Sequence, residues 1–270
     1  MPKVLVNGMT MNYEVRGTGK PVLFIHGSGV SWKMWEPQIE SLSERYEMMM
    51  IDMRGHGESS KIFPNNQYSM RVLAEDVKHF LDAMGISRIS IVGLSQGGVV
   101  SSLFAVQYPE YVEKLVLSNS YSEVPKVAGW VLHASNAIFK WLPYELILKL
   151  ILMPYGRDEY TKKIIRDSIS VDKEMLLAMK TSEFPEHTNE LHKITAPTLV
   201  MVGDKKNIGP EVQAGEIIFK HIPDAALAIF KDAFDPLSTM RRDIFNEMVL
   251  DFLDGKRLKQ YDGITYEYKD

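Results

Sequence analysis

The chain has 270 residues, a length that favours one large domain with room for an inserted subdomain. Apolar residues make up 45% and charged residues 24%, as is ordinary for a globular protein. The net charge of −4 gives no indication of a nucleic acid partner or an anionic membrane. The lack of cysteine excludes disulfides, thiolate nucleophiles and cysteine metal sites.

Neither the first residues nor the most apolar stretch of the chain indicates export or membrane insertion. The first ten residues, MPKVLVNGMT, contain no long apolar segment, so no signal peptide is visible and we expect a cytoplasmic protein. The most apolar stretch, 130–153, is interrupted by Lys140, Pro143, Glu145 and Lys149. A membrane span would not carry these charges and this proline, so we predict helix and loop that pack on a core or pocket.

Strand and helix patterns alternate through the first 120 residues. Apolar alternation on both sides of Asn7-Gly8 predicts a β-hairpin. In chain order, the predicted elements are strands 4–6, 10–15 and 22–25, helix 32–42, strand 47–51, helix 69–84, strand 88–92, helix 96–107 and strand 114–117. Ser69 is expected to cap the second of these helices. Continuous apolar strands in such an alternation indicate a parallel sheet covered on both faces.

The alternation stops near Asn119 and resumes at residue 197. Between them, 121–190 has mostly helical spacing and no strand pattern, so we predict a helical cap over the strand ends, where open α/β sheets bind ligands. The elements after the cap are strand 197–202, helix 210–220, strand 226–230 and helix 236–253. The predicted organisation is therefore an α/β core of residues 1–120 and 191–254 with a helical cap of residues 121–190.

The tail, 255–270, contains YDGITYEYKD, which is similar to VNGMTMNYEV in the first hairpin. One interpretation is an extra edge strand. The other is the start of a second, truncated copy of the domain.

The strongest chemical signal is IVGLSQGG, in which G-x-S-x-G lies between an apolar strand and a helix. The turn is so tight that Gly93 and Gly97 must lack side chains. It presents Ser95 above the sheet, where the helix dipole and the Gln96 N–H stabilise negative charge. Ser95 is therefore the candidate nucleophile.

The segment FIHGSG supplies the other half of an oxyanion hole. It follows a buried strand, and the backbone N–H of Ser28 is expected to face the Ser95 hydroxyl. Gly27 and Gly29 are expected to border the bound ligand. We interpret His26 as structural.

These two motifs, with DMRGHGES between them, appear in the order and spacing of the α/β-hydrolase family. The chain resembles that family over residues 8–254, and residues 121–190 resemble its helical cap. The resemblance implies a small-molecule enzyme in which serine attacks an acyl carbonyl, histidine moves the proton and a carboxylate orients the histidine. It implies esterases, lactonases, thioesterases and C–C bond hydrolases, with no metal or organic cofactor.

The chain departs from the family at two positions. The family pattern G-[DE]-x-D-x-x-x-P is GDKKNIGP here, so Lys206 holds the place of the catalytic acid and Asp204 matches the first, usually non-catalytic, acidic position. The family histidine follows the last strand in D-A-G-H, and DAFD places Asp235 there. The last histidine in the chain is His221, before that strand, so we predict a degenerate triad.

Two roles remain open for these replacements. An ion pair between Lys206 and Asp235 would keep the lysine protonated and the aspartate ionised. An unpaired lysine in an apolar pocket would instead act on Ser95, as in a Ser-Lys dyad. In the cap, His133 is the remaining candidate base, and Trp130 with its aromatic and aliphatic neighbours near 130–142 is expected to border an apolar pocket.

Three functions fit this pattern. The first is an acyl hydrolase with weak or atypical activity on a small apolar ester, lactone or thioester. The second is a ligand-binding sensor or carrier that keeps Ser95 as a hydrogen-bonding group. The third is a lyase, isomerase or cyclase in which Asp235 or a substrate group is the base. We favour the first, and the sequence gives no indication of the oligomeric state.

Overall fold

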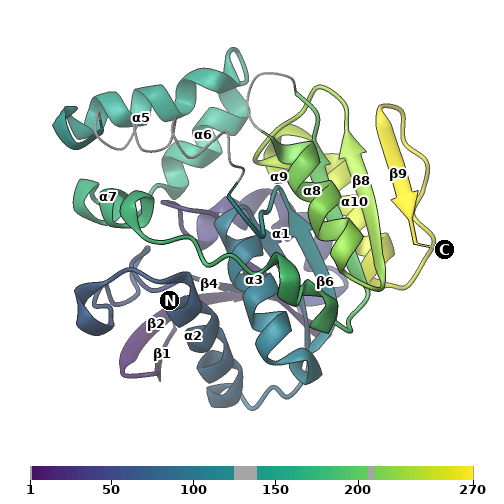
Figure 1. The fold of residues 1–270 in the computed structure, drawn as a ribbon, viewed down its shortest axis with the longest axis horizontal. Helices are drawn as coiled ribbons and strands as arrows, with labels where there is room; N and C mark the ends of the chain where they lie inside the picture. Colours follow the sequence, from purple (N-terminus) through teal and green to yellow (C-terminus); the bar gives the residue numbers. More distant parts are fainter. Residues whose placement is uncertain (1, 125–138, 206–209, 270) are drawn as a thin grey trace.

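The computed structural model describes residues 2–124, 139–205 and 210–269 (Figure 1). These residues form a nine-stranded sheet in the order β1-β2-β4-β3-β5-β6-β7-β8-β9. The strands from β4 to β8 in this order run parallel, whereas β1, β2 and β9 pair antiparallel at the two edges. The predicted α/β class with a mostly parallel sheet is confirmed.

The elements of the core follow the predicted chain order. The strands are β1 (Lys3–Val6), β2 (Met9–Arg16), β3 (Lys20–Ile25), β4 (Tyr46–Ile51), β5 (Ile89–Leu94), β6 (Val112–Ser118), β7 (Thr198–Gly203), β8 (Ala225–Phe230) and β9 (Ile264–Tyr268). The α-helices of the described residues are α1 (Glu36–Leu42), α2 (Met70–Ala83), α3 (Gln96–Gln107), α5 (Tyr144–Leu152), α6 (Glu159–Ser168), α7 (Lys173–Thr181), α8 (Glu211–His221), α9 (Leu237–Met240) and α10 (Arg242–Leu253).

The turn of the first hairpin has the predicted backbone conformation, but the start of α2 differs from the prediction. Asn7 and Gly8 both have positive φ, 45° and 70°, as a two-residue hairpin turn requires. Ser69 precedes α2 in extended conformation, but its side chain makes no capping hydrogen bond. The prediction of a Ser69 side-chain cap is wrong, because only the Ser69 carbonyl engages the helix, through the N–H of Leu73 at 3.2 Å.

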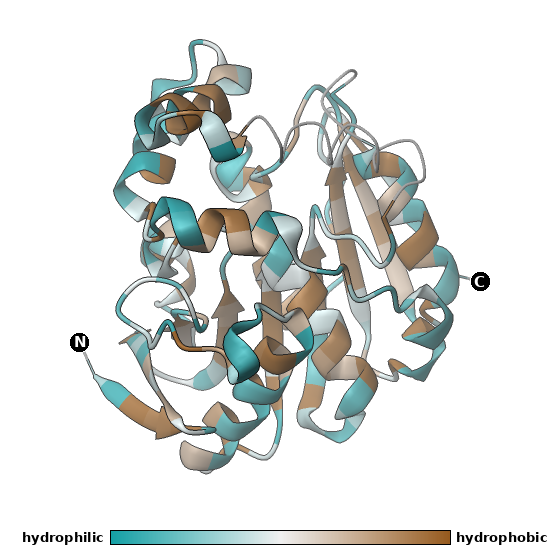
Figure 2. Ribbon diagram, turned by 60° about the vertical axis from the view of Figure 1, so that its left-hand side comes forward, coloured by the Kyte–Doolittle hydropathy of each residue, from teal (hydrophilic) through white to brown (hydrophobic). Residues whose placement is uncertain are grey.

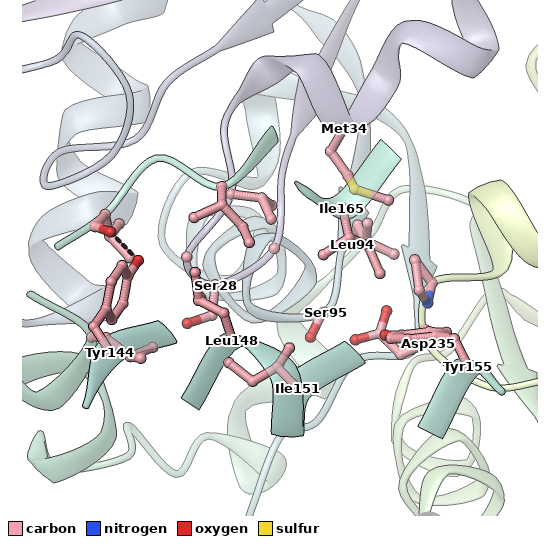
Figure 3. Close-up of a pocket in the computed structure, with 17 residues that line it drawn as sticks. Ser28, Met34, Leu94, Ser95, Tyr144, Leu148, Ile151, Tyr155, Ile165 and Asp235 are labelled. Carbon is pink, nitrogen blue, oxygen red and sulfur yellow. Dashed lines mark hydrogen bonds between the residues drawn. The ribbon is translucent and has the colours of Figure 1, made fainter. Parts of the chain in front are cut away.

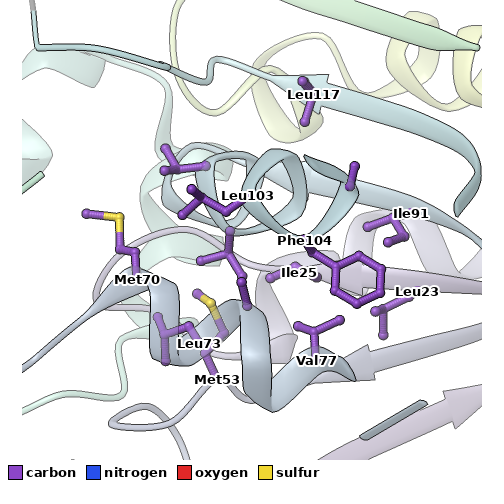
Figure 4. Close-up of a cluster of buried hydrophobic side chains, with 14 of the residues drawn as sticks. Leu23, Ile25, Met53, Met70, Leu73, Val77, Ile91, Leu103, Phe104 and Leu117 are labelled. Carbon is purple, nitrogen blue, oxygen red and sulfur yellow. The ribbon is translucent and has the colours of Figure 1, made fainter. Parts of the chain in front are cut away.

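Helices cover both faces of the sheet. On β3, Leu23 and Ile25 pack in a cluster with α2 and α3, whereas Val22 and Phe24 pack with α1 and α10. Figure 4 shows the first of these clusters between α2, α3 and the strands. Because both faces are buried, the central strands are apolar along their length, brown in Figure 2, whereas the helices are mixed.

The helices α5, α6 and α7 lie between β6 and β7 in the chain and stand apart from the sheet in Figure 1. They are tied to the loop after β3, because the N–H of Ser31 donates to the Ser168 carbonyl at 2.8 Å and Val30 forms a β-bridge with Ile169. At the other edge of the core, β9 pairs with β8, so the C-terminal segment forms an edge strand. No helix among the described residues is long and apolar enough to cross a membrane.

The loop after β4 is held by a buried ion pair. Arg54 and Asp76 have side chains 5% and 1% exposed, and Arg54 donates from Nε and Nη2 to the two carboxylate oxygens at 2.7 Å each. Asn7 Nδ2 also donates to Asp76, at 2.9 Å. This network joins the first hairpin, α2 and the loop of DMRGHGES.

We expect Asp76→Asn to lower the free energy of unfolding by about 3–5 kcal/mol, because it leaves the buried Arg54 guanidinium without its carboxylate. The matched control is Asp82→Asn in the same helix, which breaks an exposed pair with Lys78 and is expected to cost less than ~1 kcal/mol. Urea unfolding followed by circular dichroism measures both. Equal losses in the two variants would contradict the stabilising role of the buried pair.

Candidate active site

Ser95 stands in the turn between β5 and α3. Its φ of 53° and ψ of −118° are strained for a residue with a side chain. Its N–H donates to the Ser118 carbonyl at 2.8 Å, which anchors the turn to the next strand. A Cβ on Gly97 would lie 2.1 Å from the carbonyl oxygen of Ile25, and one on Gly93 would lie 2.6 Å from the carbonyl oxygen of Gly97. Both positions therefore require glycine.

The loop after β3 lies against this turn. A Cβ on Gly27 would be 3.4 Å from the Cβ of Ser95, so the two residues are neighbours. Gly27, Ser28, Gly29 and Ser95 all line one cavity. Because Gln96 begins α3, backbone N–H groups without helical partners also lie next to Ser95.

Two buried histidines hold the loop after β3 in place. Nε2 of His26 accepts from the N–H of Met53 at 3.0 Å, and Nε2 of His56 accepts from the N–H of Gly29 at 3.2 Å. Burial lowers the pKa of His26 to about 4 and, with the neighbouring His26, lowers the pKa of His56 to about 3. Both are thus neutral at neutral pH and serve as structural hydrogen-bond partners.

A third buried histidine, His187, pairs with Ser102 rather than with Ser95. Its Nε2 lies 2.8 Å from the Ser102 hydroxyl, two turns along α3, and the two residues are 2% and 1% exposed. Burial lowers the pKa of His187, so the pair is a neutral hydrogen bond between α3 and the segment before β7. No histidine is among the described residues that line the cavity at Ser95. His133 lies outside the described residues.

The cavity at Ser95 has a volume of about 210 Å³ and mostly apolar walls (Figure 3). Its apolar lining residues are Val30, Met34, Leu94, Leu148, Ile151, Ile165, Ile169, Val171, Leu176 and Pro236. Its polar lining residues are Ser28, Ser95, Tyr144, Tyr155 and Asp235. The walls therefore combine the loop after β3, the end of β5, the loop after β8 and the α-helices α5, α6 and α7.

Of the stretch near 130–142, the structure describes residues 139–142. We expect residues near 130–142 to border the cavity, but Trp141 is 85% exposed, and the described residues of that stretch do not line it. Leu148 and Ile151 of α5 contribute to the apolar wall. Helical spacing identifies such apolar positions, but the docking of the helix decides which of them reach the cavity. Trp130 lies outside the described residues.

Asp235 lies in the loop after β8 and faces Ser95. In Figure 3 the carboxylate of Asp235 and the hydroxyl of Ser95 point toward one another. Oδ1 of Asp235 is buried and has no hydrogen-bond partner among the described residues. Burial and then the nearby Glu211 carboxylate raise the pKa of Asp235 to about 7, although contact with the Ser95 hydroxyl acts to lower it.

Glu211, the first residue of α8, is a site residue that the sequence does not reveal. It is 6% exposed, and its Oε1 accepts from the N–H of Asp235 at 3.3 Å. Its Oε2 accepts from Nδ2 of Asn119, at the end of β6, at 2.6 Å. Burial raises the pKa of Glu211, while these two hydrogen bonds lower it. The Glu211 carboxyl group therefore contacts the backbone of Asp235, and the Asp235 side chain lines the cavity.

Tyr155 fixes the other side of the Asp235 loop. Its hydroxyl donates to the backbone carbonyl of Asp235 at 3.0 Å, and its ring stacks on Phe234 with centroids 5.0 Å apart. Burial raises the pKa of Tyr155, so the hydroxyl remains a neutral donor. Phe234 occupies the place of a glycine in the family pattern, and its packing against Tyr155 accounts for the larger side chain.

The loops after β7 and β8 touch, as the family pattern requires. Asp204 accepts from the N–H of Asp232 at 2.6 Å, so Asp204 joins the two loops. A Cβ on Gly203 would lie 2.0 Å from the carbonyl oxygen of Ala233. Lys206 lies outside the described residues, so its ion pair with Asp235 stays a prediction.

Comparison with known proteins agrees with this architecture. A family model described as the α/β hydrolase fold matches residues 20–150. Serine hydrolase BPHL of Mus musculus is 26% identical over 260 residues, which cover 93% of this chain and 85% of that protein. Two solved structures share the fold at 24% identity over 94% of this chain. They are an enol-lactonase from Burkholderia xenovorans LB400, covered completely with a TM-score of 0.82, and a thermophilic esterase from Thermogutta terrifontis, covered to 99% with a TM-score of 0.81.

We expect Gly97→Ala to lower the free energy of unfolding by about 3 kcal/mol or more, because its Cβ would overlap two backbone carbonyl oxygens that cannot move aside. Gly27→Ala is the matched control, since its Cβ would make ordinary contact with Ser95 and is expected to cost less than ~1 kcal/mol. Urea unfolding measures both variants. A tolerated Gly97→Ala would show that the turn is not held by this close approach.

Proposed function

We propose that this chain, which matches a model of the α/β hydrolase fold over residues 20–150, hydrolyses a small apolar ester, lactone or thioester through Ser95. One observation carries the proposal: the strained Ser95 turn places a hydroxyl at an apolar cavity, beside both Gly27 and the first turn of α3. Strain of this kind persists where the surrounding structure fixes it, and it clusters at active sites. Ser95 is the nucleophile in this proposal.

The oxyanion of the tetrahedral intermediate is held by backbone N–H groups in this account. The donors are the N–H groups of Ser28 and Gln96, from the two segments that meet at Ser95. Gly27, in the first of these segments, is a direct neighbour of Ser95. Donors fixed in advance stabilise developing charge without reorganisation, and the loss of one such donor from an enzyme costs about 10²–10³ in rate.

The triad of this hydrolase is degenerate in our proposal. Lys206 holds the place of the acid and Asp235 the place of the histidine, by register with the family motifs. The described lining residues, which include Asp235 and no histidine, support this assignment. An oxyanion hole and substrate binding alone retain roughly 10³–10⁴ of rate over water, so weak or atypical activity is expected.

The substrate class follows from the cavity. A cavity of about 210 Å³ with apolar walls suits a short aliphatic or ring acyl group better than a sugar or a phosphate ester. The names of the enol-lactonase and the esterase add support for acyl chemistry. The competing function is a ligand-binding sensor or carrier, which the lack of histidine among the described lining residues favours.

We expect a fluorophosphonate probe to label Ser95, because an activated serine attacks phosphorus and expels fluoride. Labelling increases the mass of the intact protein, which mass spectrometry measures, and Ser95→Ala should abolish this increase. The same variant should lower kcat/KM for p-nitrophenyl butyrate at least about 100-fold. Ser87→Ala, an exposed serine at the opposite end of β5, is the control and should behave like the wild type. Binding of the ester without labelling or turnover would favour the sensor or carrier.

The apolar walls predict a strong preference between two esters of similar size. We expect kcat/KM for p-nitrophenyl butyrate to exceed that for mono-p-nitrophenyl succinate at least about 100-fold, because burial of an unpaired carboxylate costs more than ~3 kcal/mol. The nearby Asp235 adds repulsion to this cost. Steady-state kinetics with both esters at one pH measures the ratio. A ratio near one would contradict the apolar assignment of the binding cavity.

A further inference from the structure

We infer that Asp235 takes the proton of Ser95 during the reaction and that Glu211 is the positioning residue for this step. The inference rests on the proposed hydrolase function. It assigns the proton transfer to a carboxylate in a place where the family uses an imidazole.

Hydrogen bonds hold the backbone of Asp235 on both sides. Glu211 accepts from its backbone N–H at 3.3 Å, and Tyr155 donates to its backbone carbonyl at 3.0 Å. With both backbone groups fixed, the side chain of Asp235 projects toward Ser95 (Figure 3). Its buried Oδ1 has no partner among the described residues, so the carboxylate retains capacity to accept a hydrogen bond.

The groups around Asp235 favour the uptake of a proton by its carboxylate. Ser95 approaches from the β5–α3 turn, Glu211 from α8, Tyr155 from the segment after α5, and Tyr121 from the segment after β6. The amine of Lys205 lies over the ring of Phe234, 4.7 Å from its centroid. Among the described residues, the groups that act on the Asp235 carboxylate are Glu211 and Ser95, and neither is a cation. Burial and the Glu211 charge therefore act together, and they make Asp235 a stronger base than an exposed carboxylate.

The proposed steps balance in atoms and charge. The Ser95 oxygen bonds to the acyl carbon while its proton moves to the Asp235 carboxylate, and the carbonyl electron pair moves to the oxygen. The intermediate then collapses, the bond to the leaving group breaks, and Asp235 returns the proton to the departing oxygen or sulfur. Water attacks the acyl-enzyme in the same way: its proton passes to Asp235 and then to Ser95, and the acid leaves.

Labelling by the fluorophosphonate probe tests the inference without knowledge of the substrate. For the wild type we expect the rate constant of Ser95 labelling to rise with pH through a midpoint near 7, because Asp235 must be ionised to accept the proton. Asp235→Asn should lower the rate at pH 8 at least about 100-fold and remove this midpoint. Asp232→Asn, an exposed residue of the same loop, is the control and should keep both rate and midpoint.

The positioning role of Glu211 has its own readout. Glu211→Gln removes a negative charge that raises the pKa of Asp235, so the midpoint should move to lower pH. Glu216→Gln, on the exposed side of the same helix, removes a charge of the same sign and should leave the midpoint in place. A Glu211→Gln variant that labels more slowly at every pH with an unchanged midpoint would overturn this role.

The outcomes separate this inference from the proposed function. A wild type not labelled on Ser95 at any pH overturns both. A wild type labelled on Ser95 without a midpoint between pH 6 and 8 overturns only the inference, and so does an Asp235→Asn variant labelled at the wild-type rate. Folding is followed separately by urea unfolding at pH 8. The midpoint of urea unfolding of Asp235→Asn should be equal to or higher than that of the wild type, because the substitution removes a buried charge.

Discussion

The close approach of α3 to the end of β3 determines the rest of the site. The space at Gly97, where a Cβ would lie 2.1 Å from the Ile25 carbonyl oxygen and 2.4 Å from that of His26, admits no side chain. This approach bends the chain at Ser95 into its strained conformation and brings Gly27 to its side. It also directs the first turn of α3 at the cavity. One packing constraint thereby brings together Ser95, the proposed nucleophile, and the backbone N–H groups that we propose as donors to the oxyanion.

The second constraint is the burial of two carboxyl groups, Asp235 and Glu211, within one hydrogen-bonded unit. Burial of charge costs stability, and neighbouring carboxylates add to that cost. Proteins depart from the residue choices that are best for stability mainly at functional sites. Tyr155 and Asn119 hold this unit through neutral hydrogen bonds, so its charge is left uncompensated among the described residues. The proposed role of Asp235 as a base rests on this arrangement.

Features that a few neighbouring residues determine could be predicted from the sequence, whereas features that depend on the packing of distant segments could not. Asn7-Gly8 and the G-x-S-x-G turn at Ser95 encode their backbone geometry within a few residues, so the sequence is sufficient to predict them. Asp235 is identifiable because it stands where the resemblance to the family places a histidine after the last strand. Glu211 is not, because an acidic residue in the first turn of a helix is ordinary, and its burial depends on how α8 docks beside the end of β6. The wall residue Leu148 likewise depends on the docking of α5.

The central claim is that Ser95 is a nucleophile placed between an oxyanion site and Asp235. A crystal structure of the protein after reaction with a fluorophosphonate tests it most directly. The account predicts a covalent bond from the Ser95 oxygen to phosphorus, with the phosphoryl oxygen within hydrogen-bond distance of the Ser28 and Gln96 N–H groups and the carboxyl of Asp235 on the opposite side. An adduct on another residue, or a phosphoryl oxygen turned away from both N–H groups, would contradict it.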